Sequence, residues 1–263
     1  MDTTEATAAA REASNSRVVE WGARLGYVTV GLIHLLIAWI ALKVAWGFGG
    51  GSKKADTSGA LQTMASTSTG VVALWICVVG FFLLAVWQLL EAALHHSEAS
   101  DRLKAAAKGV TYLFFAWSTF KVGQGASSSA EKQTEDFTAG LMGSPGGRVL
   151  VAVVGLVVLG IAGYHVYKGW TKKFLEDLRE HPGQWAVTAG RIGYIAKGVA
   201  LAIVGLLFVV AGVTRRARTA GGLDTALHTL RDQPMGPVLL TMVAIGLVAY
   251  GVYSFARARY ARV

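Results

Sequence analysis

Two histidines, His34 and His165, lie inside long apolar runs of this sequence, where an ionisable side chain is costly. His34 is near the middle of its run, and His165 is close to the basic end of another. Each imidazole predicts either a proton relay or ligand contact, or a neutral ring hydrogen-bonded to a neighbouring helix. Together they could hold a haem between helices, but at about 1.5 Å per residue they lie at different depths. We therefore predict no cofactor.

Two lysines, Lys43 and Lys121, stand one helical turn before Gly47 and Gly125, in equivalent surroundings near the far ends of their apolar runs. Both could extend their ammonium groups to the outer membrane interface along an apolar stem. Alternatively, both lie beside a central axis and attract an anion. A third equivalent position holds Val210, so a complete ring of three charges is not expected.

Charged residues also end three other apolar runs at one level, namely Glu91, Lys168 and Arg257. Solvation at the membrane interface explains charges in this position. We predict in addition a salt bridge from Glu91 to Lys168 or Arg257.

The sequence lacks the common signatures of catalysis and metal binding. A single cysteine, Cys77, forms no intramolecular disulfide and suggests no metal site. The run 49–51 of three glycines lacks the Lys-Ser/Thr ending of a phosphate-binding loop, and no metalloprotease helix or nucleophile elbow appears. Acidic residues are absent from the centres of the apolar runs. We predict no catalytic, cofactor-binding or metal residues, and a protein that is not an enzyme.

The elements that carry these residues are predicted to be membrane-spanning helices. The chain is 53% hydrophobic and 16% charged, whereas soluble domains carry about 25% charge. A helix needs roughly 20 apolar residues to cross a bilayer, and the apolar runs are continuous rather than alternating, which excludes β-barrel strands. The six predicted spans are residues 25–46, 71–91, 105–122, 149–168, 192–213 and 237–255. Residues 1–21 are polar, and we predict a disordered tail without a cleavable signal.

The net charge of +9 is explained by orientation in a membrane rather than by nucleic acid as a partner. Lys and Arg are more numerous on the side of the membrane that holds both chain ends, with Lys108 and Lys197 counted among the flanking residues. We predict a multi-pass membrane protein with both termini in the cytoplasm.

The sequence repeats itself three times, over residues 22–95, 102–173 and 189–263. Each copy holds two spans, so it begins and ends on the same side of the membrane. Parallel repeats of this kind are related by an axis along the membrane normal, which predicts three tandem helical hairpins with pseudo-threefold symmetry. Short helical pieces at 60–65, 137–142 and 223–230 are expected to cap the outer face. The matching positions are Arg24, Arg102 and Arg191; Gly31, Gly109 and Gly198; and Gly70, Gly147 and Gly236.

The third copy carries the most specific motifs, with Arg191-Ile-Gly-Tyr194 followed by Lys197-Gly198, and later Tyr250-Gly-Val-Tyr253. These motifs resemble a bacterial membrane family known as domain of unknown function 1206. The resemblance covers almost the whole chain and implies three tandem repeats of paired transmembrane helices. It implies no catalytic residues. The second copy departs from the pattern, since Ala105 replaces the tyrosine of the other copies.

Three hypotheses of function follow. The first is a structural or accessory membrane protein, embedded in the lipid bilayer as a subunit of a larger complex, because the loops are small and few polar residues stand at span centres. The second is a small carrier or channel with a path along the pseudo-threefold axis, which Lys43 and Lys121 favour. The third, with the least support, is a membrane redox protein or enzyme.

Overall fold

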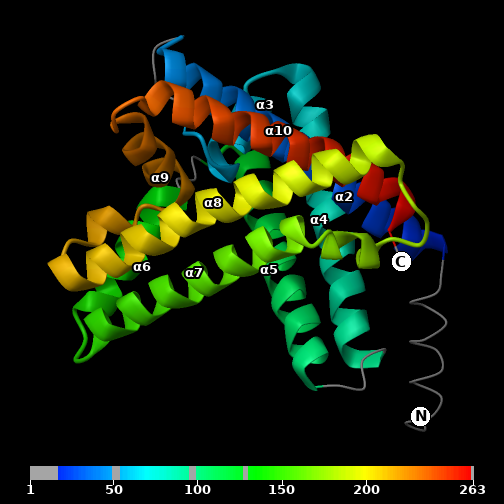
Figure 1. Ribbon diagram of the computed structural model, residues 1–263. Helices are drawn as coiled ribbons and strands as arrows, with labels where there is room; N and C mark the ends of the chain where they lie inside the picture. The colour runs from blue at the N-terminus through cyan, green and yellow to red at the C-terminus, as the bar shows by residue number, and fades with distance from the viewer. Residues whose placement is uncertain (1–16, 49–53, 95–98, 127–129, 262–263) are drawn as a thin grey trace, which may run out of the picture.

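The computed structural model describes residues 17–48, 54–94, 99–126 and 130–261, which form an all-helical protein (Figure 1). Residues 17–21 of the predicted tail belong to the first helix, and the rest of that tail lies outside the described residues. Each copy of the repeat contributes a long helix, a short helix and a second long helix. The copies are α2 (Arg17–Trp46), α3 (Thr57–Ala65) and α4 (Ser68–Leu94); α5 (Ala99–Gly123), α6 (Ala130–Met142) and α7 (Gly147–Trp170); and α8 (Gln184–Thr214), α9 (Gly222–Arg231) and α10 (Gly236–Tyr260).

Five of the long helices are long and apolar enough to cross a membrane, namely α2, α4, α7, α8 and α10. The sequence predicts six spans, and the missing one is α5. This helix is long enough, but Lys104, Lys108 and Lys121 make it more polar than the others. The three short helices predicted before the second spans are present as α3, α6 and α9. We call their end of the molecule the cap end, and the end where α2 begins and α10 finishes the terminal end.

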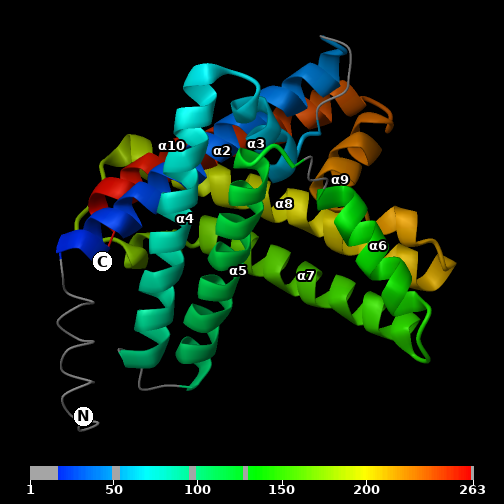
Figure 2. The same cartoon turned by 180° about the vertical axis from the view of Figure 1, so that it is seen from behind.

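The tightest packing joins helices of different copies. The second long helix of each copy packs along the first long helix of the next, as α4 on α5, α7 on α8, and α10 on α2 (Figures 1 and 2). Glycines make these approaches close, because a methyl group at Gly155 would lie 2.7 Å from the carbonyl oxygen of Gly205. One at Gly31 would lie 3.0 Å from the oxygen of Gly251. Small residues serve this purpose in membrane helices.

Packing within a copy is uneven. In the first copy α2 packs on α4, and in the third α8 packs on α10. The long helices of the second copy, α5 and α7, do not pack along each other, so the hairpin predicted for this copy is not seen in the structure. The long helices therefore follow one another as α5, α4, α2, α10, α8 and α7. In both views the α4–α5 pair and the α7–α8 pair run in different directions.

A repeated glycine stands in the first turn of the second long helix of every copy. A side chain there would collide with the last turn of the preceding cap helix, at 2.0, 1.7 and 1.8 Å from the carbonyl oxygens of Met64, Leu141 and Arg231. Atoms this close cannot be accommodated by small shifts. The structure thus explains why the sequence repeats glycine at Gly70, Gly147 and Gly236.

Candidate functional site

Cations and tyrosines from all three copies meet inside the bundle, in its terminal half. We call this group the basic–aromatic cluster. It is made from α2, α7, α8, α10 and the short 3-10 helix η1 (Lys173–Asp177). Its members are Tyr27, Lys168, Asp177, Tyr194, Lys197, Tyr250 and Arg257.

One carboxylate joins two of the cations. Lys168 Nζ lies 2.7 Å and Arg257 Nη2 lies 3.5 Å from Oδ2 of Asp177. Arg257 also lies over the ring of Tyr27, at 4.4 Å, and its buried Nε has no hydrogen-bond partner in the structure. Burial acts to raise the pKa of Asp177, but Arg257 and Lys168 outweigh it and hold the pKa below its usual value.

A buried aromatic side chain of η1, which acts as its anchor, fixes the position of Asp177 at the ends of α7 and α10. After α7 ends, Lys172 adopts a left-handed backbone conformation and the chain turns into η1. Phe174 of η1 is fully buried between the rings of Tyr194 and Tyr253, at 5.4 and 5.1 Å. The hydroxyl of Tyr253 donates a hydrogen bond to the Phe174 carbonyl at 3.1 Å. This anchor fixes η1, and therefore its last residue, against the ends of α7 and α10.

Lys197 enters the cluster from α8. Its ammonium donates to the hydroxyl of Tyr250 at 3.2 Å and lies 4.3 Å from the centre of that ring. Its sequence position predicts a flanking residue, but Lys197 lies inside the bundle on a helix that begins at Gln184. A signal was present, since Lys108 and Lys197 each precede a repeated glycine, Gly109 and Gly198.

The two predicted histidines each pack against a tyrosine of the cluster. The ring of His34 packs 4.6 Å from Tyr250, and the ring of His165 lies 5.8 Å from Tyr194. Each Nδ1 lies within hydrogen-bond distance of a carbonyl on its own helix, Val30 at 2.8 Å and Ile161 at 2.9 Å. The predicted bond to a neighbouring helix is replaced by ring packing on another helix.

The two predicted lysines are exposed and do not reach the cluster. Lys43 lies over the ring of Trp39 at 5.3 Å, and Lys121 over that of Trp117 at 5.1 Å. Both tryptophans are more than half exposed. This repeated cation–π pair fits a position at the membrane interface.

Glu91 is partly buried near the end of α4. The sequence predicts that it pairs with Lys168 or Arg257. The carboxylate that both cations contact is instead that of Asp177, which lies at the end of η1 between α7 and α8.

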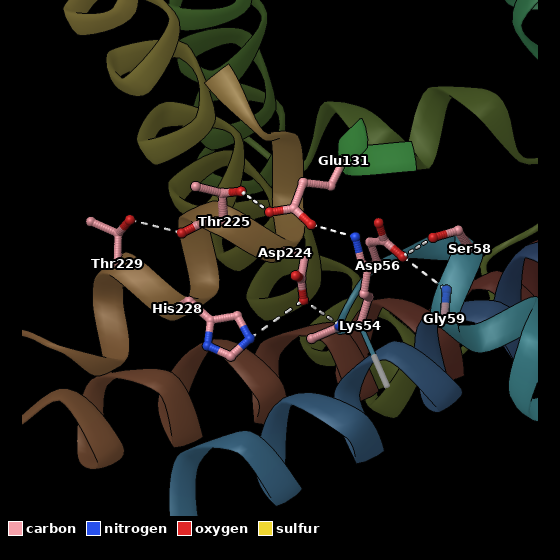
Figure 3. Close-up of polar contacts among 10 residues, drawn as sticks. Lys54, Asp56, Ser58, Gly59, Glu131, Asp224, Thr225, His228 and Thr229 are labelled. Carbon is pink, nitrogen blue, oxygen red and sulfur yellow. Dashed lines mark hydrogen bonds and ion pairs between the residues drawn. The ribbon is translucent and has the colours of Figure 1, made fainter. Parts of the chain in front are cut away.

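A second polar group joins the cap helices of the three copies (Figure 3). Glu131 of α6 forms an ion pair with Lys54, which precedes α3, and accepts a hydrogen bond from Thr225 of α9 at 3.2 Å. Asp224 of α9 accepts a hydrogen bond from the Ala55 amide at 2.6 Å. We call these residues the cap network. It holds together the ends of three copies that are far apart in sequence.

The cap network also includes the N-terminal cap of α3, and two of its carboxyl groups have shifted pKa values. Asp56 caps α3 by accepting hydrogen bonds from Ser58 and the Gly59 amide, at 2.6 and 2.9 Å. His228 Nε2 lies 3.7 Å from Asp224. The pKa of Glu131 is lowered chiefly by its hydrogen bond from Lys54. The pKa of Asp224 is raised because burial outweighs the Ala55 hydrogen bond and the nearby imidazole.

Replacement of Asp224 by asparagine is expected to preserve or slightly raise thermal stability at neutral pH. A raised pKa means that the folded state prefers the protonated carboxyl, so the stability it contributes is lost as pH rises through the folded pKa. Asparagine is neutral and still accepts from the Ala55 amide, whereas alanine leaves that buried amide unpaired at a cost of about 1–3 kcal/mol. Melting curves in detergent should rank alanine below both asparagine and wild type. Equal losses for the two variants would contradict this account.

Comparison with known proteins supports the repeat. The family described as Domain of Unknown Function (DUF1206) matches three stretches, residues 25–95, 103–172 and 192–261. An uncharacterized protein of Bacillus subtilis (strain 168), YxxB, is 27% identical over 251 residues, which cover 90% of this chain and 89% of that protein. No solved structure matches. With five apolar spans and three copies of a membrane repeat, the chain is a multi-pass membrane protein.

Proposed function

The chain belongs to the family described as Domain of Unknown Function (DUF1206), and we propose that it binds an anion inside its helical bundle as a small carrier. The site is the basic–aromatic cluster. In this proposal α5 is the sixth span and both termini lie in the cytoplasm, so the cluster occupies the cytoplasmic half of a bacterial inner membrane. The proposal includes no enzymatic activity, because the described residues of the cluster supply charge and hydrogen-bond donors for binding an anion.

The observation that carries the proposal is the position of Lys197. A charged lysine costs about 2.5–3.5 kcal/mol at the centre of a membrane helix. The cost is smaller in the cytoplasmic half, where Lys197 lies, but charged residues inside membrane spans still mark the paths of ions and substrates. Lys197 contacts the hydroxyl and ring of Tyr250, and both are neutral groups. An anion beside the ammonium would supply the missing countercharge.

The neighbours of Lys197 strengthen the argument. Lys168 and Arg257 share the one carboxylate of Asp177, so these three residues carry an excess of positive charge. Tyrosine hydroxyls add neutral hydrogen-bond donors, which suit an anion of any shape. The path along the pseudo-threefold axis would then be defined by Lys197 rather than by Lys43 and Lys121.

The proposal is tested by binding of inorganic phosphate and sulfate to the protein purified in a neutral detergent. Replacement of Lys197 by glutamine is expected to weaken binding at least tenfold, because it removes the ammonium and leaves Tyr250 in place. Lys121→Gln is the matched control, since it removes a lysine from an exposed helix face. Equal affinity of both variants and the wild type would reject the site. Flux of the bound anion into liposomes then tests the carrier role.

A role as an accessory subunit is the second candidate, favoured by the small loops between the long helices. Mass determination of the intact complex, extracted gently from its native membrane, distinguishes the two. A stoichiometric protein partner would support the accessory role, and a lone protomer or homo-oligomer would support the carrier.

A further inference from the structure

We propose that Asp177 is a built-in competitor for the anion of the basic–aromatic cluster, and that the anion binds by taking the place of its carboxylate. This inference rests on the proposed anion site and adds how that site is regulated. Three features carry it: the oxygen atom that two cations share, the unused donor of Arg257, and the fixed backbone on both sides of Asp177.

A single oxygen atom of Asp177 serves two cations. Lys168 Nζ and Arg257 Nη2 lie 2.7 and 3.5 Å from Oδ2. Lys168 belongs to α7 and Arg257 to α10, so the carboxylate joins helices of two different copies. An external anion with an oxygen atom at this position would make the same charge-assisted contacts. Asp177 therefore occupies a place that suits a free anion.

Arg257 keeps a donor that Asp177 does not use. Its contact with the carboxylate is made by Nη2, whereas its buried Nε has no hydrogen-bond partner. A buried donor without a partner is unfavourable. Nε and Nη2 lie on the same edge of a guanidinium group, so an anion with several oxygen atoms, such as phosphate, can accept from both. A free anion would thus satisfy Arg257 better than the tethered carboxylate does.

The place of Asp177 is continuous with that of Lys197. Lys168, which Asp177 binds, lies over the ring of Tyr194 at 5.6 Å. That ring packs 5.3 Å from the ring of Tyr250, whose hydroxyl accepts the hydrogen bond from Lys197. The carboxylate thus neutralises one end of the cluster and leaves Lys197 at the other. Its withdrawal would open both ends of the cluster to one anion.

The carboxylate can withdraw without any movement of η1. Phe174 anchors the start of this helix, and Leu178, directly after Asp177, forms a β-bridge with Ala261. The backbone is therefore held on both sides of Asp177. Its side chain still keeps 29% of its exposure, so rotation about the Cα–Cβ bond can carry the carboxylate away from the cations.

The test titrates inorganic phosphate into the full-length protein in a neutral detergent, at a temperature at which each variant is folded. Asp177→Asn is expected to bind phosphate about tenfold more tightly than wild type, because its neutral amide leaves both cations free for charge-assisted contacts. Glu176→Gln is the matched control. It removes the same charge from the exposed neighbouring residue of η1, so its affinity should equal that of wild type.

A small carboxylate tests whether the competition is direct. Formate should raise the melting temperature of Asp177→Asn, because it can occupy the position that the missing carboxylate leaves. It should leave the wild type unchanged, since that position is filled. Equal effects of formate on both proteins would contradict direct competition.

A second variant keeps the carboxylate and weakens its hold, since Asp177→Asn is expected to lose stability. Phe174→Leu removes the ring that packs against Tyr194 and Tyr253, and it should raise phosphate affinity severalfold. Wild-type affinity in both variants, with binding still dependent on Lys197, would overturn the competitor and leave the anion site standing. Equal gains in Glu176→Gln and Asp177→Asn would also overturn it. Phosphate binding that does not depend on Lys197 would overturn the site and the competitor together.

Discussion

Replacement of Asp177 by asparagine is expected to lower the thermal stability of the protein strongly, by about 2–3 kcal/mol. Removing one partner of a buried ion pair costs roughly 3–5 kcal/mol, and the effect here is smaller because the Asp177 side chain keeps 29% of its exposure. The loss is still large, since Lys168 and Arg257 both lose their shared carboxylate. Melting curves in detergent measure it, with Glu176→Gln as the control because Glu176 is the exposed neighbour in η1.

The same variant should change the dependence of stability on pH. The folded protein holds the pKa of Asp177 below its usual value, so its contribution is present at neutral pH and is lost as pH falls below about 3.9, the unfolded value, and through the folded pKa. The difference between wild type and Asp177→Asn should therefore shrink on acidification. A difference that stays constant would show that Asp177 acts through packing and not through its charge.

Replacement of Gly155 by alanine is the second large effect that we expect. The added methyl group would lie 2.7 Å from the carbonyl oxygen of Gly205 and from the amide nitrogen of Val209. Both are backbone atoms, so α7 and α8 must move apart along their contact. Overpacking of this kind costs about 1–3 kcal/mol, and detergent melting or retention of the folded fraction after heating should report it.

The control lies one and a half turns away on the same helix. A methyl group at Gly160 meets nothing within 4 Å, and alanine is the better helix former by about 1 kcal/mol. Gly160→Ala should therefore be neutral or slightly stabilising. If both alanine variants lose the same stability, the loss comes from the helix backbone and the close approach of α7 to α8 is not its cause.

The architecture could be predicted from the sequence to the level of elements. The glycines at Gly70, Gly147 and Gly236 recur in register with the cap helices, and the structure shows why they must. The choice of partner for each helix could not be predicted. Some glycines approach a helix of the same copy, as Gly193 approaches Tyr250, and others approach a helix of another copy, as Gly205 approaches Gly155. Because the spacing of glycines in the sequence is the same in both cases, it does not indicate which helix is the partner.

Only some residues of the candidate site could be predicted from the sequence. His34 and His165 stand out because they interrupt apolar runs, and they do border the cluster. The depth of Lys197 could not be predicted, because a lysine near the end of an apolar run is usually a flanking residue and this run has no sharp limits. The position of Asp177 could not be predicted either, because it reaches the cluster only through the burial of Phe174.

The contact of α10 with α2 has a consequence for biosynthesis. The first long helix of the chain finds its main partner only when the last one has been made. During translation α2 must stay in the bilayer with its glycine-lined face open, while the two intervening pairs assemble. A protein truncated before Gly236 should accordingly expose that face to quality-control proteases, and the release of the C-terminal helix from the ribosome becomes the step that commits the whole chain to its native state.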